Sequence, residues 1–291
     1  MPRSRLTCRL LTVAAGITLL LAWAPVSLAA PEPTRSRVES SASESKIEIG
    51  TTFTLESKAL GTTRNVNVCL PLGYEDGDTS YPVVYLLDGG VQQDLLPVAG
   101  FAALATLSGQ YEEFILVGVE TINRSLELTT PSEVPYDLEV IPLNGDALKF
   151  RRFVVDEVQP FIDARFRTSH ETAVLGESLA GLFIVETFLR APESFDHYIA
   201  VSPSVWWEGK ALARAAADLL AAPGFPTDRS LYLTVADEVD IKPPLTEIVS
   251  ALTDHAPAGL TWWYEPLPNE HHHTIYHPAT LDALRRIFAP E

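Results

Sequence analysis

Cysteine is scarce in this chain, since only Cys8 and Cys69 occur among 291 residues. Cys8 lies in an N-terminal segment that we expect to be removed, which leaves Cys69 without a partner. An internal disulfide framework is therefore excluded. Cys69 falls in the alternating run 66–70, so we interpret it as a buried small hydrophobic residue rather than a nucleophile.

Basic residues are also few, with 21 Lys and Arg against 38 Asp and Glu and a formal net charge of -17. No Lys/Arg cluster remains outside the extreme N-terminus. This composition argues against nucleic acid and anionic membrane surfaces as partners. It also mildly disfavours strongly anionic substrates.

Long apolar runs are missing apart from Leu10–Trp23, which follows Arg3, Arg5 and Arg9 and precedes the small-residue stretch 27–29. This order is typical of a secretory signal peptide with its cleavage site. The apolar run is short for a membrane span. We therefore expect a periplasmic or secreted protein that is not inserted in a membrane after the signal is removed.

This interpretation divides the chain into three parts. Residues 1–29 are expected to be the signal peptide, and 30–46 a flexible tether, because that stretch is rich in Pro, Ser and Glu. Residues 47–291 are enough for one large domain with a substantial core. The sequence does not indicate the oligomeric state.

Within that domain, strand-like and helix-like patterns alternate along the chain. Alternation of this kind implies a mostly parallel sheet covered by helices on both faces, an α/β class. An antiparallel pair is expected at the start, near 53–55 and 65–70, and the long irregular loop 123–144 is a candidate roof over a site. The later strands are expected at 82–87, 114–119, 173–175, 197–201, 231–235 and 260–264, and the helices at 146–166, 179–190, 211–220, 245–252 and 278–288.

The segment Thr172–Leu182 combines a short apolar strand, a turn of small residues with Ser178 at its tip, and a helix. This is the form of a nucleophile elbow, usually written G-x-S-x-G. Small flanking residues allow the sharp turn that exposes the serine hydroxyl. Ala180 stands where the second glycine is usual, and Gly181 follows it.

A serine becomes a useful nucleophile when a histidine, oriented by a carboxylate, accepts its proton. In a doubly wound sheet these partners follow the serine in the order acid, then histidine. The segment Glu270–Thr274 contains His271, His272 and His273 and lies before the last helix, where a base belongs. A metal site is the weaker interpretation of these histidines, because no further Cys, His or Asp residues have the spacing of metal ligands.

The orienting acid is expected in Ala236–Asp240, directly after the strand 231–235. The usual position of the acid past the strand end favours Asp240, with Glu238 as the main rival and Asp237 also open. For the oxyanion hole, the backbone N–H of Leu179 is one expected donor and that of Gly90 the other.

Taken together, the ordered segments Tyr81–Gly89, Asn123–Pro131, Gly176–Phe183, Ala200–Trp207 and Glu270–Thr274 resemble the putative-esterase branch of the α/β-hydrolase superfamily. That branch includes the enterochelin and other siderophore esterases and the esterase D-type hydrolases, and more distantly the mycolyltransferases. The resemblance covers nearly the whole chain from about Ile47 onward. It implies an α/β-hydrolase fold with a mostly parallel central sheet and helices on both faces.

Carried over by position, the resemblance makes Ser178 the nucleophile and, through an E-x-H-x-T pattern, His272 the base. Trp206 and Trp207 match a Trp pair near the site, although packing of a large apolar surface is an equally good interpretation of both side chains. Arg124 matches a substrate-contacting arginine, but the residues after it depart from the family pattern.

The function implied is that of an exported serine esterase, which cleaves a carboxylic ester through an acyl-enzyme. No cofactor or metal is implied, and the partner is a small-molecule ester. Two alternatives stay open: an acyltransferase that uses the same triad, and a non-catalytic binding protein on the same fold. The sequence does not identify the ester.

Overall fold

The computed structural model describes residues 43–290, and the part from Ile47 onward forms one compact unit. The predicted signal peptide and most of the predicted tether lie outside the described residues.

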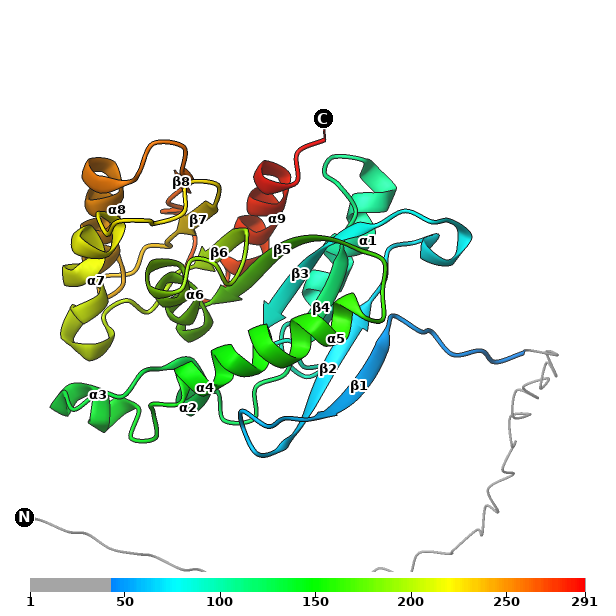
Figure 1. The fold of residues 1–291 in the computed structure, drawn as a ribbon, viewed down its shortest axis with the longest axis horizontal. Coiled ribbons are helices and arrows are strands. Elements are labelled where there is room, and N and C mark those ends of the chain that lie inside the picture. The colour runs from blue at the N-terminus through cyan, green and yellow to red at the C-terminus, as the bar shows by residue number, and fades with distance from the viewer. Residues whose placement is uncertain (1–42, 291) are drawn as a thin grey trace, which may run out of the picture. The chain divides into compact units, whose positions relative to one another are not determined.

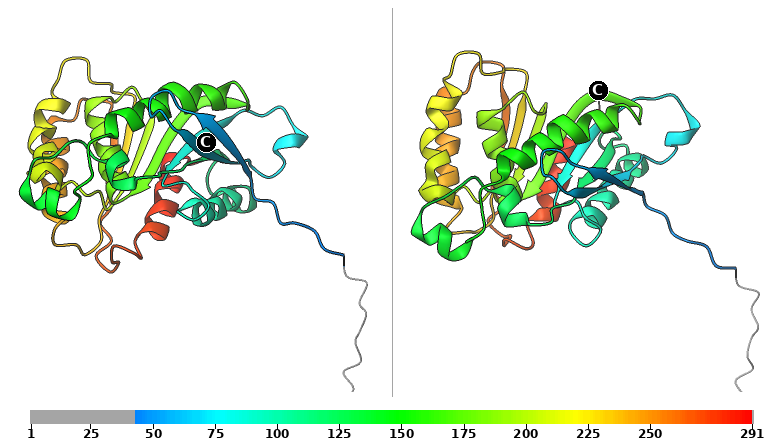
Figure 2. Two further views of the ribbon diagram at one scale, coloured as in Figure 1. Left: turned by 90° about the horizontal axis from the view of Figure 1, so that it is seen from below. Right: turned by 60° about the horizontal axis from the view of Figure 1, so that its bottom comes forward.

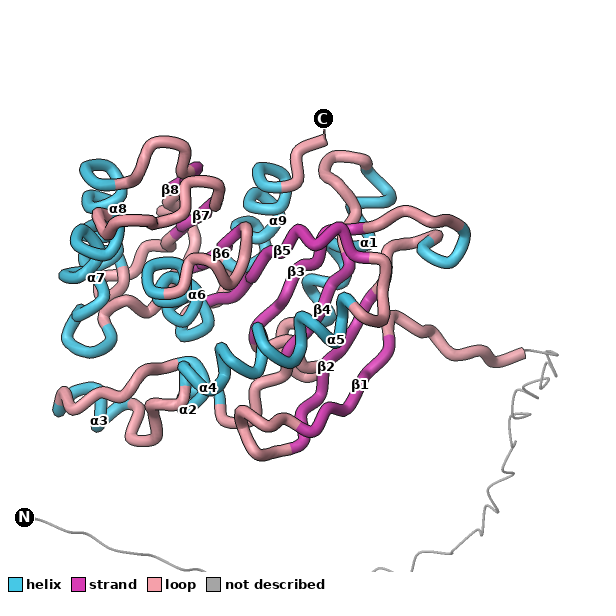
Figure 3. The backbone as a smooth tube through the Cα atoms, in the orientation of Figure 1, coloured by secondary structure: helices cyan, strands magenta, loops and turns pink. Residues whose placement is uncertain are grey.

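The centre of this unit is an eight-stranded sheet with the order β1-β2-β4-β3-β5-β6-β7-β8 (Figures 1 and 3). β1 pairs with β2, and β2 with β4, in antiparallel fashion, whereas all other neighbours are parallel. The mostly parallel sheet and its antiparallel opening pair are thus confirmed. The strands are β1 (Thr51–Glu56), β2 (Thr63–Cys69), β3 (Tyr81–Leu87), β4 (Ile115–Val119), β5 (Thr168–Glu177), β6 (His197–Val201), β7 (Ser230–Thr234) and β8 (Thr261–Tyr264).

Helices cover both faces of the sheet, as Figure 2 shows from two directions. Helices α1 and α9 pack on one face, and α4 to α8 on the other. The helices are α1 (Leu95–Ser108), α2 (Arg124–Leu128), α3 (Pro135–Val140), α4 (Ala147–Arg152), α5 (Gln159–Asp163), α6 (Leu179–Arg190), α7 (Trp207–Leu220), α8 (Lys242–His255) and α9 (Tyr276–Ile287), with a short 3₁₀ turn η1 (Tyr74–Asp76).

The position of strand β3, buried on both faces of the sheet, explains why its sequence is a continuous apolar run. Val84 and Leu86 contribute to the core under α1 and α9, while Val83 and Tyr85 contribute to the core on the opposite face. Alternate side chains of a strand point to opposite faces, so a strand covered on both sides must be apolar throughout. Burial of each such side chain stabilises the fold by about 1.5–3 kcal/mol.

The helix expected over 146–166 is present, but it is interrupted by a π-helical segment, η2 (Phe153–Val158), between α4 and α5. Pro160 lies in the first turn of α5, two residues after this segment, and has no N–H to donate to the preceding turn. Short π-helical segments of this kind occur mostly inside α-helices.

Two parts of the chain differ from the sequence expectation. The segment 123–144, expected to be irregular, contains the short helices α2 and α3. Helix α1 has no counterpart among the expected elements, because it is apolar on all sides and lacks the amphipathic spacing that reveals a helix. In the part of the chain that the structure describes, no helix has the length and apolar character to cross a membrane.

Candidate active site

Ser178 lies at the sharp turn between β5 and α6, at the carboxyl edge of the sheet. Its backbone has φ 62° and ψ -115°, a conformation that L-residues other than glycine rarely adopt. The turn is held by hydrogen bonds from Ser178 N–H to the Val201 carbonyl, 2.9 Å, and from Ser204 N–H to the Ser178 carbonyl, 3.0 Å. Strain that is fixed in this way is typical of functional positions.

The small residues of the elbow fit each other sterically. A Cβ placed on Gly176 would lie 2.5 Å from the Cβ of Ala180, far inside van der Waals contact. A Cβ on Gly181 would lie 2.9 Å from Pro203 Cα, so the glycine after Ala180 allows α6 to pack closely on the loop after β6. Ala180 therefore fills space that Gly176 leaves open, which explains why alanine is tolerated there.

His272, in the loop between β8 and α9, is paired with Glu238, in the loop after β7. The distance from His272 Nδ1 to Glu238 Oε1 is 2.5 Å. The Glu238 hydrogen bond raises the pKa of His272, and this effect outweighs the lowering of that pKa by burial. The pair therefore favours the protonated imidazole, as required of a base that must accept a proton.

Ser202 gives Glu238 a second partner. Its hydroxyl donates to Glu238 Oε2 at 2.5 Å, and the N–H of Ala236 reaches the same carboxylate oxygen at 3.2 Å. Burial raises the pKa of Glu238, but the hydrogen bonds from His272, Ser202 and Ala236 outweigh it, so the pKa is lowered. Glu238 is thereby kept ionised and fixed in orientation.

The acid next to the imidazole is thus Glu238 and not Asp240, the residue that the sequence favoured. Asp240 is exposed two residues further along the turn and lines the cavity without reaching His272. Asp237 is tied through its N–H to the Glu270 carbonyl, 3.1 Å. Strand β7 ends at Thr234, one residue earlier than expected, and the second carboxylate of the turn that follows meets the histidine.

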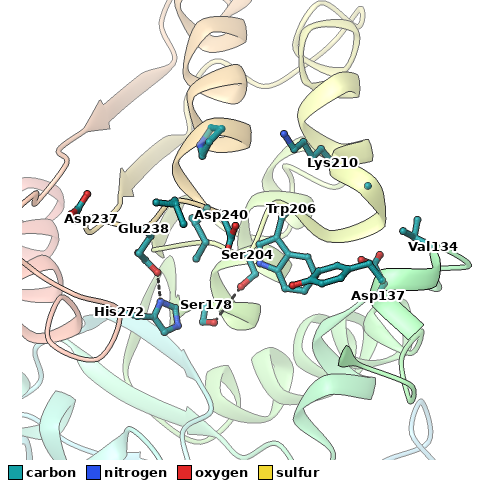
Figure 4. A pocket seen from close by; sticks show the side chains of 15 residues that line it. Val134, Asp137, Ser178, Ser204, Trp206, Lys210, Asp237, Glu238, Asp240 and His272 are labelled. Carbon is teal, nitrogen blue, oxygen red and sulfur yellow. Dashed lines mark hydrogen bonds and ion pairs between the residues drawn. The ribbon is translucent and has the colours of Figure 1, made fainter. Parts of the chain in front are cut away.

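Ser178, His272 and Glu238 line one cavity of about 840 Å³ (Figure 4). Among the described residues, the side chain hydrogen-bonded to Ser178 Oγ is Ser204, with 3.3 Å between the two hydroxyl oxygens. His272 lies beside Ser178 in the same cavity without a hydrogen bond to it.

The two adjacent tryptophans have different environments. Trp206 lines the cavity and makes an edge-to-face contact with Tyr136 at a centroid distance of 5.8 Å. Trp207 is 2% exposed and donates its indole N–H to the Thr130 carbonyl, 3.0 Å. Trp206 therefore lines the cavity where a ligand would bind, whereas Trp207 is buried and anchors the segment before α3, which fits its packing interpretation.

Arg124 lines a second, smaller cavity that also borders on Ser178 and His272. Its Nε lies 2.6 Å from Asp88 Oδ2, and its Nη2 donates to the Glu177 carbonyl at 3.1 Å. The guanidinium thus lines a cavity that includes the nucleophile, and its charge is already paired with Asp88.

Leu179 begins α6, so its N–H is among those that have no partner within the helix. An N–H directly after the nucleophile, at the positive end of a helix, is suited to an oxyanion. The N–H of Gly90 instead donates to the side-chain oxygen of Gln93 at 2.9 Å. The structure thus places one of the two expected donors in a suitable position and the other in an internal hydrogen bond.

Within residues 43–290 no three His, Cys, Asp or Glu side chains are grouped so as to hold a metal ion. Cys69 is 5% exposed, and burial raises the pKa of its thiol to about 11. Its interpretation as a core residue is confirmed.

Sequence reasoning missed the contributions of Ser202, Ser204 and Glu177. The two serines flank Pro203, in a segment already noted for its resemblance, and Glu177 is the residue before the nucleophile. Their side-chain roles depend on contacts with residues far away in the chain, so no local pattern reveals them.

The family model described as "Putative esterase" matches residues 57–238, more than half of the chain. The chain belongs to this esterase family. Similar curated proteins are the siderophore triacetylfusarinine C esterase of Aspergillus fumigatus, 28% identical over 188 residues, and the ferri-bacillibactin esterase BesA of Bacillus subtilis, 32% identical over 143 residues. These matches cover 59% and 44% of this chain, and 61% and 49% of the relatives' own lengths.

A solved structure supports the same assignment of the fold. The IroE-like serine hydrolase from Shewanella oneidensis superposes with a TM-score of 0.74 at 25% identity, covering 82% of this chain and 80% of that one. The esterase fold is therefore the α/β-hydrolase fold that the sequence predicted. The matched curated relatives extend well beyond the regions shared with this chain.

Proposed function

We propose that this esterase-family chain is an exported serine hydrolase that cleaves a carboxylic ester through an acyl-enzyme. The observation that carries the proposal is the shared cavity in which Ser178, on a strained elbow, lies beside the His272–Glu238 pair. The N-terminal sequence before residue 30 supports export. The names of the relatives make siderophore esters the first natural substrates to assay.

In this mechanism Ser178 Oγ attacks the ester carbonyl while His272 Nε2 accepts the hydroxyl proton. Glu238 holds Nδ1 and stabilises the imidazolium. The Leu179 N–H stabilises the oxyanion. The tetrahedral intermediate then expels the alcohol, which receives the proton from His272, and water attacks the acyl-enzyme in the reverse sequence of proton transfers.

The experiment that tests the proposal pairs fluorophosphonate labelling with hydrolysis of p-nitrophenyl acetate and butyrate. Ser178→Ala should abolish labelling, and both Ser178→Ala and His272→Ala should lower kcat/KM by about 10³-fold or more. Activity retained in pure, folded Ser178→Ala protein would refute the mechanism. A parent protein that neither labels nor hydrolyses any ester would favour a binding role.

A further inference from the structure

The smaller cavity beside the nucleophile is lined mainly by ionisable side chains. It has a volume of about 280 Å³ and shares Ser178 and His272 with the larger cavity. We call it the acid-lined arm; its other lining residues are Asp88, Gln93, Asp94, Arg124 and Glu177. A group attached to the scissile ester would enter either this arm or the larger cavity.

Negative charge exceeds positive charge in the arm. Three carboxyl groups, from Asp88, Asp94 and Glu177, face one guanidinium, from Arg124, so the formal excess is two negative charges when all are ionised. Asp88 already holds Arg124, with 2.6 Å between Nε and Oδ2, and also accepts the Thr121 hydroxyl at 2.5 Å. Asp94 and Glu177 therefore provide the unbalanced charge.

Glu177 lacks a side-chain partner at one of its oxygens. Its Oε1 is buried and makes no hydrogen bond to any described residue. Burial raises the pKa of Glu177 to about 7, with His272 opposing and Asp94 adding to the rise. Burial and Asp88 likewise raise the pKa of Asp94 to about 6. At both carboxyls burial is the largest cause of the raised pKa, a neighbouring carboxyl adds to the rise, and the opposing effect of Arg124 does not offset it.

Tyr276, on α9, has a buried hydroxyl group that lacks a hydrogen-bond partner among the residues that the structure describes. The residue is only 5% exposed, and its hydroxyl has no hydrogen-bond partner within residues 43–290. Besides burial, the charges of Asp94, Glu177 and Asp88 raise the pKa of this phenol. These three carboxyls line the acid-lined arm, whereas the Tyr276 side chain is buried near them and is not itself part of the lining. A buried donor left without a partner is unusual in a native protein.

We propose that the acid-lined arm binds a positively charged group of the ester substrate, a protonated amine or a quaternary ammonium, and that Glu177 and Asp94 set this preference. The inference rests on the proposed function and adds the substrate class. A cation in the arm supplies the charge that Arg124 does not. An organic cation fits better than a metal ion, because no three acidic or histidine ligands are grouped for one in the described part of the chain.

The pH dependence of this preference follows from the same groups. Glu177 and Asp94 attract a cation only when ionised, so the advantage of a cationic over a neutral ester should grow as pH rises from 5 to 8. His272 must be neutral for either ester, and its titration cancels in the ratio. The groups that face the two carboxyls are Asp88, Arg124, His272, Tyr276, His277 and, across the site, Glu238.

The test compares two esters that differ by one atom: butyrylcholine and its uncharged isostere 3,3-dimethylbutyl butyrate. The parent protein should show a kcat/KM about tenfold higher for the choline ester at pH 8 and a smaller ratio at pH 5. Glu177→Gln and Asp94→Asn each remove one charge and little volume, and each should lower the ratio several-fold. Asp254→Asn removes an exposed charge on α8 and should leave the ratio unchanged.

The parent ratio is measured without any substitution, so the test does not depend on a variant that folds. Equal rates for the two esters, or a faster neutral ester, with turnover that still requires Ser178, would overturn the cationic subsite and leave the esterase intact. A preference that survives in both variants would overturn the roles of Glu177 and Asp94. Absence of both turnover and fluorophosphonate labelling would overturn the proposed function and the inference with it.

Discussion

Glu238 sets the tautomer and orientation of the proposed base, His272. Its Oε1 lies 2.5 Å from His272 Nδ1, and its other carboxylate oxygen is held by Ser202. Loss of such a carboxylate leaves the imidazole free to adopt the wrong tautomer and removes its stabilising charge. Asp240, two residues further along, makes no contact of this kind and serves as a matched comparison.

We therefore expect Glu238→Gln to lower kcat/KM for p-nitrophenyl butyrate by about 10²–10⁴-fold. Asp240→Asn should lower it by less than about threefold, because exposed charges interact weakly. Steady-state kinetics on both purified variants provide the measurement. The reverse ranking would make Asp240 the orienting acid after all.

The same pair predicts the direction of a pH shift. The Glu238 hydrogen bond raises the pKa of His272, so its removal should lower that pKa. Since the base must be neutral to accept a proton, kcat/KM increases as pH rises through the His272 pKa. The residual activity of Glu238→Gln should therefore reach its plateau at a lower pH than that of the parent. A profile shifted to higher pH would contradict this assignment of the pair.

At the scale of elements, the elbow depends on the steric fit between β5 and α6. Helix α6 is almost entirely buried, so little space exists for the backbone to shift. Gly176 and Ala180 share the space at the turn, where a Cβ on Gly176 would lie 2.5 Å from that of Ala180.

Gly176→Ala should accordingly lower the free energy of unfolding by about 1–3 kcal/mol through overpacking. Ala180→Gly alone should cost about 1 kcal/mol, because glycine is unfavourable in a helix. In the double variant Gly176→Ala/Ala180→Gly the clash is removed, so the two effects should not add. Urea unfolding of the four proteins measures this coupling, and strict additivity would show that the two positions do not compete for space.

At the scale of the whole molecule, the core encloses Cys69 at the end of β2, where the residue is 5% exposed and burial raises the pKa of its thiol to about 11. A buried neutral thiol does not react with disulfide reagents, because the thiolate is the nucleophile. Its reactivity therefore reports the opening of the fold.

Cys69 should react with 5,5′-dithiobis(2-nitrobenzoate) only at urea concentrations where the fold is lost, with the same midpoint as the change in tryptophan fluorescence. A Cys69→Ala variant accounts for any reaction at Cys8. Fast labelling of Cys69 in buffer would mean that the β2 edge opens without global unfolding.

Local patterns in the sequence determined much of this protein: the continuous apolar strands, their alternation with helices, the elbow at Ser178 and the histidine segment after β8. These features depend on side-chain periodicity and short-range sterics, which neighbouring residues define by themselves. The notable exception is α1, whose uniformly apolar surface carries no periodic signal.

Only the tertiary structure decided between neighbouring candidates. It selected Glu238 over Asp240, buried Trp207 while leaving Trp206 at the cavity, and engaged the Gly90 N–H with Gln93. Adjacent residues have nearly equal local preferences, so the outcome depends on loop geometry and on partners distant in sequence. Ser202 and Thr130, which hold Glu238 and Trp207, are 36 and 77 residues away from them.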